Sequence, residues 1–198
     1  MNEGLRDDIV CMAGKLFGEA GFYATTMEQI AKSLKISKLS LYSRFAGKED
    51  LFQAVIQGKC ESYMPGKLFE DLVNLPIEEA LYQVAIGLMN LLTSEDVTKM
   101  ERMLAGADAS SREILLNLFY QSGPARFKSK LAAYFVHLHD KKEAVFPHPE
   151  TAADMFSALI KGSGICMRAQ MGISPVATEA DKVAYCREIV SVFIAGHR

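Results

Sequence analysis

A run of basic residues near the N-terminus is the feature of this sequence best suited to binding a charged partner. Between residues 32 and 48 there are five basic side chains and no acidic one: Lys32, Lys35, Lys38, Arg44 and Lys48. A local basic face is what phosphate binding requires, even in a chain whose formal net charge is −2. The run therefore indicates a surface that binds nucleic-acid phosphates or, as the plainer alternative, a solvated helix face.

Two threonines that precede the run can begin a helix. Thr25 and Thr26 each complete an S/T-x-x-E/Q capping box, with Glu28 and Gln29 respectively, so a helix is predicted to start near Met27. The free N–H groups at the start of a helix favour phosphate, as does the positive end of the helix dipole. Capping threonines and a basic stretch are together what phosphate binding needs.

The histidines and cysteines do not form a metal-ligating or redox pattern. Three histidines lie close in sequence, but residues two apart on a helix face different sides and a loop separates the third, so surface positions are predicted for His137, His139 and His148. The cysteines lie far apart without a C-x-x-C pair and are interpreted as reduced thiols in helices: Cys11, Cys60, Cys166 and Cys186. No metal and no cofactor are expected.

The sequence also lacks the patterns typical of an enzyme or a membrane protein. No Ser-His-Asp, nucleophile-elbow, phosphate-loop or G-x-G-x-x-G pattern is present. Apolar residues make up 49% and charged residues 23% of the 198 residues, as in an ordinary globular protein. The apolar stretches are far shorter than the roughly 20 residues that cross a bilayer, and the N-terminus has no signal-peptide pattern. A non-enzymatic, cytoplasmic protein is expected.

Four amphipathic helices are predicted to position the basic run. The first buries a stripe over residues 9–20, and the second covers residues 27–34. The third follows Ser37 as its N-cap and turns Leu41 and Phe45 inward, and the fourth starts near Lys48. Two short helices joined by a three-residue turn are the helix-turn-helix layout, although a plain helical bundle would show the same periodicity.

Further helices are predicted downstream of Pro65. One begins at Pro76, and the others cover about residues 95–107, 110–121, 124–139, 150–171 and 179–195. Thr178 is the expected cap of the last helix, and Gly196 ends it. The pattern predicts an all-α fold.

Residues 6–56 resemble the DNA-binding domain of TetR-family transcriptional regulators. The resemblance rests on these residues at family spacing: Arg6–Ala13, Leu16-Phe17, Gly21-Phe22, Thr25–Met27, Ile30-Ala31, Ile36–Lys38, Ser40–Tyr42, Phe45 and Lys48–Phe52. The remaining chain resembles a C-terminal domain of some members through Pro76–Leu81, Gly123–Arg126 and Lys161-Gly162. Lys35 departs from the glycine usual in the recognition turn, and Leu39 from the usual small residue.

The resemblance implies an N-terminal three-helix helix-turn-helix domain over residues 1–56, with its last helix continuing as a connector to about residue 64. It implies a C-terminal helical effector-binding and dimerisation bundle over residues 65–198. If the recognition turn needs a positive φ at Lys35, lysine costs on the order of 1 kcal/mol relative to glycine there.

The resemblance also assigns roles in DNA binding. Lys38 can read guanine or pair with phosphate, Leu39 can meet a thymine methyl group, and Tyr42 can lie half in the core. Thr26 and Lys48 are expected at phosphates, because they stand at the starts of helices. The full set of expected DNA contacts is Thr26, Ser37, Lys38, Leu39, Ser40, Tyr42, Arg44 and Lys48.

The C-terminal part is rich in methionines and aromatic residues, which suit a deformable apolar pocket but can equally fill the core. The candidates for effector binding are Met89, Met100, Met103, Phe119, Tyr120, Phe127 and Met167. The last two helices resemble the dimer interface of the family, and the expected contacts are Ala158, Gly162, Val183, Val190 and Phe193.

These expectations describe a homodimeric repressor that binds double-stranded operator DNA and is released by a small apolar or aromatic effector. The alternative is a helical small-molecule-binding protein or enzyme that retains a non-functional helix-turn-helix. Such a protein has no need of a 17-residue basic stretch preceded by capping threonines, so the sequence favours the regulator.

Overall fold

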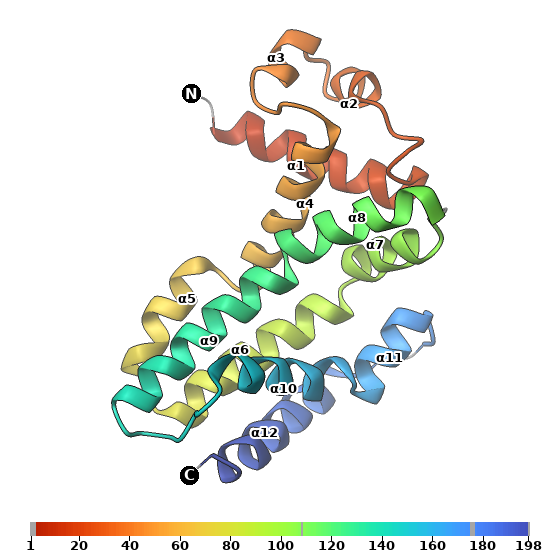
Figure 1. Cartoon of the computed structure of the whole chain (residues 1–198). Helices are drawn as coiled ribbons and strands as arrows, with labels where there is room; N and C mark the ends of the chain where they lie inside the picture. Colours follow the sequence, from red (N-terminus) through yellow and green to blue (C-terminus); the bar gives the residue numbers. More distant parts are fainter. Residues whose placement is uncertain (1–2, 108, 175–176, 198) are drawn as a thin grey trace. The chain divides into compact units, whose positions relative to one another are not determined.

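The computed structural model describes residues 3–107, 109–174 and 177–197. Every regular element within these residues is helical, so the all-α prediction is confirmed (Figure 1). In chain order the elements are α1 (Glu3–Ala20), α2 (Met27–Ser33), α3 (Lys38–Tyr42), α4 (Lys48–Tyr63), α5 (Gly66–Asp71), the 3-10 turn η1 (Leu72–Asn74), α6 (Ile77–Thr93), α7 (Glu95–Ala105), α8 (Ala109–Ser122), α9 (Pro124–Asp140), α10 (Pro149–Lys161), α11 (Gly164–Met171) and α12 (Glu179–Ala195).

The helices form two compact units. Unit 1 comprises Met1–Lys59 and Glu95–Gly123, and unit 2 comprises Cys60–Ser94 and Pro124–Arg198. Helix α7 belongs to unit 1 because it packs against α1, and α8 packs against α7. The domain boundary expected from the sequence, near residue 65, instead places these two helices in the C-terminal effector-binding domain. That boundary stays a prediction.

Three phenylalanine rings form the centre of unit 1. Phe17 on α1 lies 5.4 Å from Phe22 and 5.6 Å from Phe52 on α4, and Phe22 lies 5.2 Å from Phe52, measured between ring centroids. Tilted and edge-to-face ring pairs add to the stabilisation that apolar burial provides. Ile9 and Ala13 on the same helix are fully buried, as the stripe in the sequence predicts. Helix α1 is therefore the platform on which α2 and α4 rest.

The turn between α2 and α3 has a backbone conformation that favours glycine. Lys35 has a φ of 55°. Its N–H donates to the carbonyl of Lys32 at 3.1 Å, and the N–H of Ile36 donates to that of Ala31 at 3.0 Å. These bonds satisfy carbonyls at the end of α2 and set the direction of the chain into α3. The stabilisation of the turn must offset the strain of a side chain in the left-handed region.

A cluster of aromatic rings forms the core of unit 2. Phe135 of α9 stacks on Phe146 with ring centroids 4.3 Å apart. Phe193 of α12 lies 5.6 Å from Phe135 and 4.9 Å from Phe156 of α10. Phe193 and Val190 are each only 4% exposed. Val190 and Phe193, which were expected to contact a partner subunit, thus lie on a stripe that packs inside its own protomer.

The single helix predicted over residues 150–171 is in fact two helices. Helix α10 ends at Lys161 and α11 begins at Gly164. The buried Ser163 is the N-cap of α11, and its hydroxyl accepts a hydrogen bond from the N–H of Cys166 at 3.1 Å. A capping hydroxyl between two glycines makes a new helix start more favourable than continuation. The break at Gly123 was predicted correctly, since α8 ends and α9 begins on either side of it.

Candidate nucleic-acid interface

A capping box fixes the start of α2, and Thr26 forms it. The N–H of Gln29 donates to the Thr26 hydroxyl at 3.1 Å, and the Gln29 side chain accepts from the Thr26 N–H at 2.7 Å. Thr25 is buried instead, and its hydroxyl donates to the Gly21 carbonyl at 2.8 Å. Of the two threonines that the sequence offered as caps, only Thr26 is exposed and open to a phosphate.

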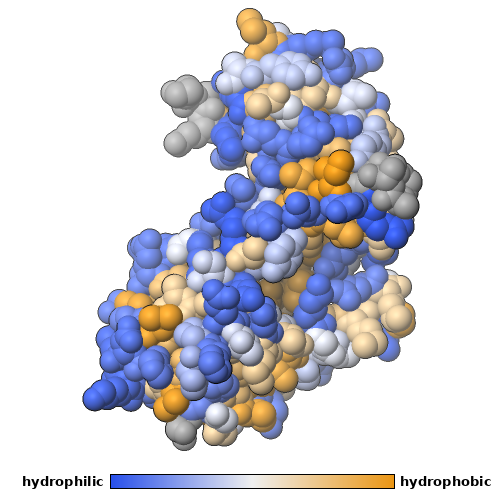
Figure 2. All heavy atoms as spheres, in the orientation of Figure 1, coloured by the Kyte–Doolittle hydropathy of each residue, from blue (hydrophilic) through white to orange (hydrophobic). Residues whose placement is uncertain are grey.

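Helix α3 is a short helix with one buried side and one exposed side. The Ser37 hydroxyl caps it by accepting from the N–H of Ser40 at 3.0 Å. Leu41 is fully buried, whereas Tyr42 is 48% and Leu39 80% exposed. Figure 2 shows apolar surface over the α3 region, with hydrophilic residues beside it. Burial of Leu41 therefore turns Leu39 and Tyr42 outward, as the predicted interface requires.

Ion pairing holds Lys38 against α2. The Lys38 ammonium lies 2.7 Å from a carboxylate oxygen of Glu28, and both side chains are more than half exposed. Hydrogen bonding to Lys38 lowers the pKa of Glu28. Sequence analysis did not identify Glu28 as a partner of the interface, because it stood out only as a capping-box candidate.

Arg44 braces the C-terminal end of α3. One guanidinium nitrogen donates to the Ser40 carbonyl at 2.8 Å, to the Ser40 hydroxyl at 3.1 Å and to the Ser43 hydroxyl at 3.2 Å. These bonds satisfy a carbonyl at the end of the helix and place positive charge at the negative end of its dipole. Arg44 and Ser40, both predicted as DNA contacts, thus contact each other.

Lys48 points toward the turn between α1 and α2. Its ammonium donates to the carbonyls of Phe22 at 2.9 Å and Thr25 at 3.0 Å, and it lies 4.5 Å from the centre of the Phe22 ring and 5.5 Å from that of Tyr23. Burial lowers the pKa of Lys48. Lys48, which was expected to bind a phosphate, therefore contacts carbonyls and aromatic faces of the protein itself.

The predicted effector residues divide between the two units. Met100 and Met103 of α7 and Phe119 and Tyr120 of α8 lie in unit 1, whereas Met89, Phe127 and Met167 lie in unit 2. Met100 is buried, Met103 and Phe119 are half-buried, and Tyr120 and Met167 are about half exposed. The structure therefore does not gather these seven side chains within one unit.

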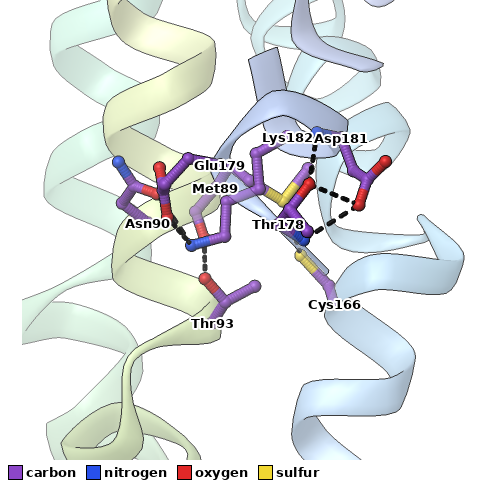
Figure 3. Close-up of polar contacts among 8 residues, drawn as sticks. All are labelled: Met89, Asn90, Thr93, Cys166, Thr178, Glu179, Asp181 and Lys182. Atoms are coloured by element: carbon purple, nitrogen blue, oxygen red, sulfur yellow. Dashed lines mark hydrogen bonds and ion pairs between the residues drawn. The ribbon is translucent and has the colours of Figure 1, made fainter. Parts of the chain in front are cut away.

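In unit 2, Met89 is fully buried where α6, α11 and α12 meet. The Cys166 sulfur lies 3.6 Å from the Met89 sulfur (Figure 3). In the same region the Lys182 ammonium bridges the side-chain oxygens of Asn90 at 3.1 Å and Glu179 at 2.9 Å. Thr178 caps α12 in a box with Asp181, as predicted for that threonine. The Lys182–Asn90 bond thus ties α12 to α6, and the sulfur contact joins α11 to α6.

Helices α10 and α12 expose apolar side chains next to the predicted dimer contacts. Ala158 and Gly162 are exposed on α10, together with Met155 at 54% and Leu159 at 41%. On α12, Val183 is 38% and Val192 58% exposed. The Tyr185 hydroxyl donates to the Leu159 carbonyl at 3.2 Å and joins the two helices. The two exposed faces are thus carried by helices in direct contact.

The three histidines differ in their surroundings. His139 and His148 are exposed, as predicted, and the Nδ1 atom of His139 accepts from the N–H of Phe146 at 3.1 Å. His137 is half-buried, and its Nε2 atom is buried, which corrects the surface position predicted for it. The described part of the chain holds no cluster of three or more His, Cys, Asp or Glu side chains placed for a metal ion.

Within the described ranges, none of the helices has the length and apolar character that crossing a membrane would require.

Two family models match the chain. Residues 9–55 match the model described as bacterial regulatory proteins of the tetR family. Residues 79–197 match the model described as the C-terminal domain of AefR-like transcriptional repressors. The first covers α2 and α3, and the second covers most of α6 to α12.

Curated relatives are similar over shorter segments. The HTH-type transcriptional regulator HbdR of Aromatoleum sp. strain CIB is 36% identical over 61 residues, which are 31% of this chain and 27% of that protein. IcaR, the HTH-type negative transcriptional regulator of the biofilm operon icaADBC in Staphylococcus aureus strain Newman, is 35% identical over 81 residues, which are 40% of this chain and 42% of that protein. Each match spans less than half the length of the relative.

A solved structure is similar over nearly the whole chain. The Flavonoid-responsive Regulator FrrA superposes with a TM-score of 0.71 and 28% sequence identity, over 98% of this chain and 96% of that one.

Proposed function

This chain belongs to the TetR family of bacterial transcriptional regulators, and we propose that it is a homodimeric repressor that leaves its operator when a small apolar or aromatic effector binds. The observation that carries the proposal is the outward presentation of α3. Leu39 is 80% exposed on this helix, although burial of an apolar side chain is favourable. A DNA groove offers that side chain a surface to cover it.

In the proposed complex, α3 enters the major groove. Leu39 contacts a thymine methyl group, and Lys38 contacts a phosphate or the O6 and N7 atoms of guanine. Ser37, Ser40 and Tyr42 supply hydroxyls beside them. Thr26 lies at the start of α2, where free N–H groups favour phosphate. These residues remain the predicted DNA contacts, with Arg44 supporting Ser40 from within the protein.

The repressor role is supported by the names of similar proteins. The C-terminal match is to a model of repressors, and IcaR is a negative regulator. The flavonoid response of FrrA supports an aromatic effector for this chain. For a tenfold loss of operator affinity, the effector must favour the released form by about 1.4 kcal/mol. By linkage, operator DNA must then weaken effector binding tenfold.

The proposed dimer forms through the exposed faces of α10 and α12. Ala158, Gly162 and Val183 stay in the proposed interface, and the exposed Met155 and Val192 extend it. A two-fold dimer presents two copies of α3, so the operator is expected to be a near-palindrome with half-sites about one helical turn, roughly 34 Å, or a small multiple apart.

Selection of binding sites from random double-stranded DNA, followed by footprinting, tests the proposal. We expect one enriched near-palindrome and protection of both half-sites. Failure to enrich any sequence would favour the alternative function, a helical small-molecule-binding protein or enzyme that retains a non-functional helix-turn-helix. Protection of a single asymmetric half-site would contradict binding by a two-fold dimer.

A further inference from the structure

Two buried polar atoms on α9 have no hydrogen-bond partner among the residues that the structure describes. They are the hydroxyl oxygen of Tyr134 and the Nε2 atom of His137. The Tyr134 side chain lies deep in unit 2, since the residue is only 4% exposed. A buried polar atom without a partner costs free energy, so native proteins satisfy nearly all of them with protein atoms, ordered water or a ligand. No described residue of the chain supplies a partner for either atom of this pair on α9.

Both atoms belong to one face of α9. Tyr134 and His137 are three residues apart, so their side chains lie on the same side of the helix. The spacing of Phe127 and Lys130 places them on the same face, one to two turns earlier. There the Phe127 ring contacts Phe69 of α5 with centroids 6.1 Å apart, and the Lys130 ammonium lies 5.8 Å from the centre of the Phe69 ring. The unpartnered atoms thus continue a face that is aromatic and half-buried at its other end.

The Tyr134 hydroxyl keeps its proton at neutral pH. Burial, with the negative charge of Glu143 as a smaller cause, raises the pKa of Tyr134 to about 12. The hydroxyl is therefore available as a donor. The Nε2 atom of His137 accepts or donates according to the tautomer of the ring. A hydroxyl group has the chemistry that both atoms need, since it can accept from Tyr134 and either donate to or accept from His137.

We propose that Tyr134 and His137 anchor the hydroxyl group of a small, mainly apolar effector, such as a phenol or an alcohol. The inference rests on the proposed function and specifies the chemistry of the effector. A fully apolar molecule leaves both atoms unsatisfied, whereas a hydroxylated one gains hydrogen bonds in surroundings of low dielectric constant. The nearby charge of Glu143 disfavours a second negative charge, so a neutral hydroxyl is preferred to a carboxylate.

A comparison of two substitutions in the ligand-free protein is the first test. Tyr134→Phe removes a hydroxyl without a protein partner, and Tyr185→Phe removes one that donates to the Leu159 carbonyl at 3.2 Å. We expect Tyr134→Phe to leave Tm unchanged or to raise it, and Tyr185→Phe to lower it. A decrease of Tm in Tyr134→Phe as large as that in Tyr185→Phe would mean that bound water already satisfies the hydroxyl, and it would overturn the proposal.

Binding of two matched probes to the full-length protein is the second test. 2-Naphthol and naphthalene share one ring system and differ by a hydroxyl, and calorimetry measures the affinity of each. We expect the wild-type protein to bind 2-naphthol about tenfold more tightly, which corresponds to one satisfied buried hydrogen bond. Tyr134→Phe should abolish this preference without weakening naphthalene, and Tyr185→Phe should keep it.

Two substitutions of the histidine complete the test. His137→Leu should reduce the preference for 2-naphthol, and His137→Gln should restore part of it, because the side-chain amide can replace Nε2. Equal affinities of the two probes for the wild-type protein, binding of neither probe, or an unchanged preference in Tyr134→Phe would each contradict the proposal. Neither titration includes DNA, so failure of the proposed repressor function in a DNA-binding assay is a separate result.

Discussion

The ammonium of Lys48 at the start of α4 lies 2.9 Å from the carbonyl oxygen of Phe22, in the turn between α1 and α2. The same ammonium donates to the carbonyl of Thr25 at 3.0 Å. Lys48 therefore joins α4 to the turn before the capping box of Thr26. Its position in the sequence predicts a phosphate contact, whereas these bonds predict that Lys48 acts as a positioning residue.

Salt dependence distinguishes the two roles of Lys48. Removal of a lysine that contacts phosphate reduces the slope of log affinity against log salt concentration by about 1. We expect Lys48→Met to lower the free energy of unfolding by about 1 kcal/mol through the lost hydrogen bonds. It should weaken operator binding with an unchanged slope. Lys38→Met is the control, and its slope should decrease. A decrease of the slope in Lys48→Met would show a phosphate contact and refute the positioning role.

The positive φ of Lys35 predicts a stabilising substitution. Lys35→Gly should raise the free energy of unfolding by about 1 kcal/mol, because glycine adopts the left-handed region without a Cβ clash. Lys142 has a φ of 60° in unit 2, so Lys142→Gly should behave alike. Lys141→Gly, beside a residue with positive φ, should not stabilise. Urea denaturation measures all three. Equal effects of Lys141→Gly and Lys142→Gly would show that backbone strain is not the cause.

The exposed apolar face of α12 predicts the effect of a charge on dimerisation. Val192 is 58% exposed there, and a carboxylate buried between two subunits is unfavourable. Val192→Glu should therefore shift the protein from dimer to monomer at micromolar concentration in sedimentation experiments. Val136→Glu is the matched control, because Val136 is 45% exposed on α9. A Val192→Glu protein that sediments as the wild-type dimer would place the interface elsewhere.

Two buried acidic groups predict a loss of stability at alkaline pH. Burial raises the pKa of Cys186 from 9.0 to about 11 and that of Tyr134 from 10.0 to about 12. The unfolded chain releases these protons at lower pH than the folded protein does. Between the pKa values of the two states, the folded protein therefore binds more protons than the unfolded chain. The free energy of unfolding should therefore be constant with respect to these groups below pH 9 and fall as pH rises toward 12.

Denaturation of the wild type and of Cys186→Ala over pH 8 to 11 tests this expectation. Removal of the thiol should make the decrease of the free energy of unfolding between pH 9 and pH 11 smaller, while Cys60, whose pKa burial also raises, continues to contribute to it. A decrease of the same size in both proteins would show that Cys186 does not contribute to it.

The sequence predicts helices and their inner faces well, because periodicity reports which side of a helix is apolar. It does not report what covers that side, and for this reason Val190 and Phe193 were assigned to a partner although they pack inside the protomer. The start of α11 had a local signal that was missed, the Gly-Ser-Gly sequence around Ser163.

In the candidate site, too, the sequence predicts local features but not contacts between distant segments. Capping chemistry is local, so Thr26 and Ser37 could be identified as caps from their neighbours in sequence. The bonds of Lys48 to residues 22 and 25 and the buried nitrogen of His137 depend on how distant segments pack together. No spacing rule along one helix contains that information.

Recognition of operator DNA by α3 is tested most directly by the affinity for a selected operator and for a scrambled duplex of the same composition, measured at several salt concentrations. The wild-type protein should prefer the operator by at least about a thousandfold. Leu39→Ala should reduce this preference by about tenfold or more and leave the affinity for the scrambled duplex unchanged. Leu116→Ala, at a 44% exposed position on α8, should match the wild type. Equal affinities of the wild type for the two duplexes, or an unchanged preference in Leu39→Ala, would contradict recognition through α3.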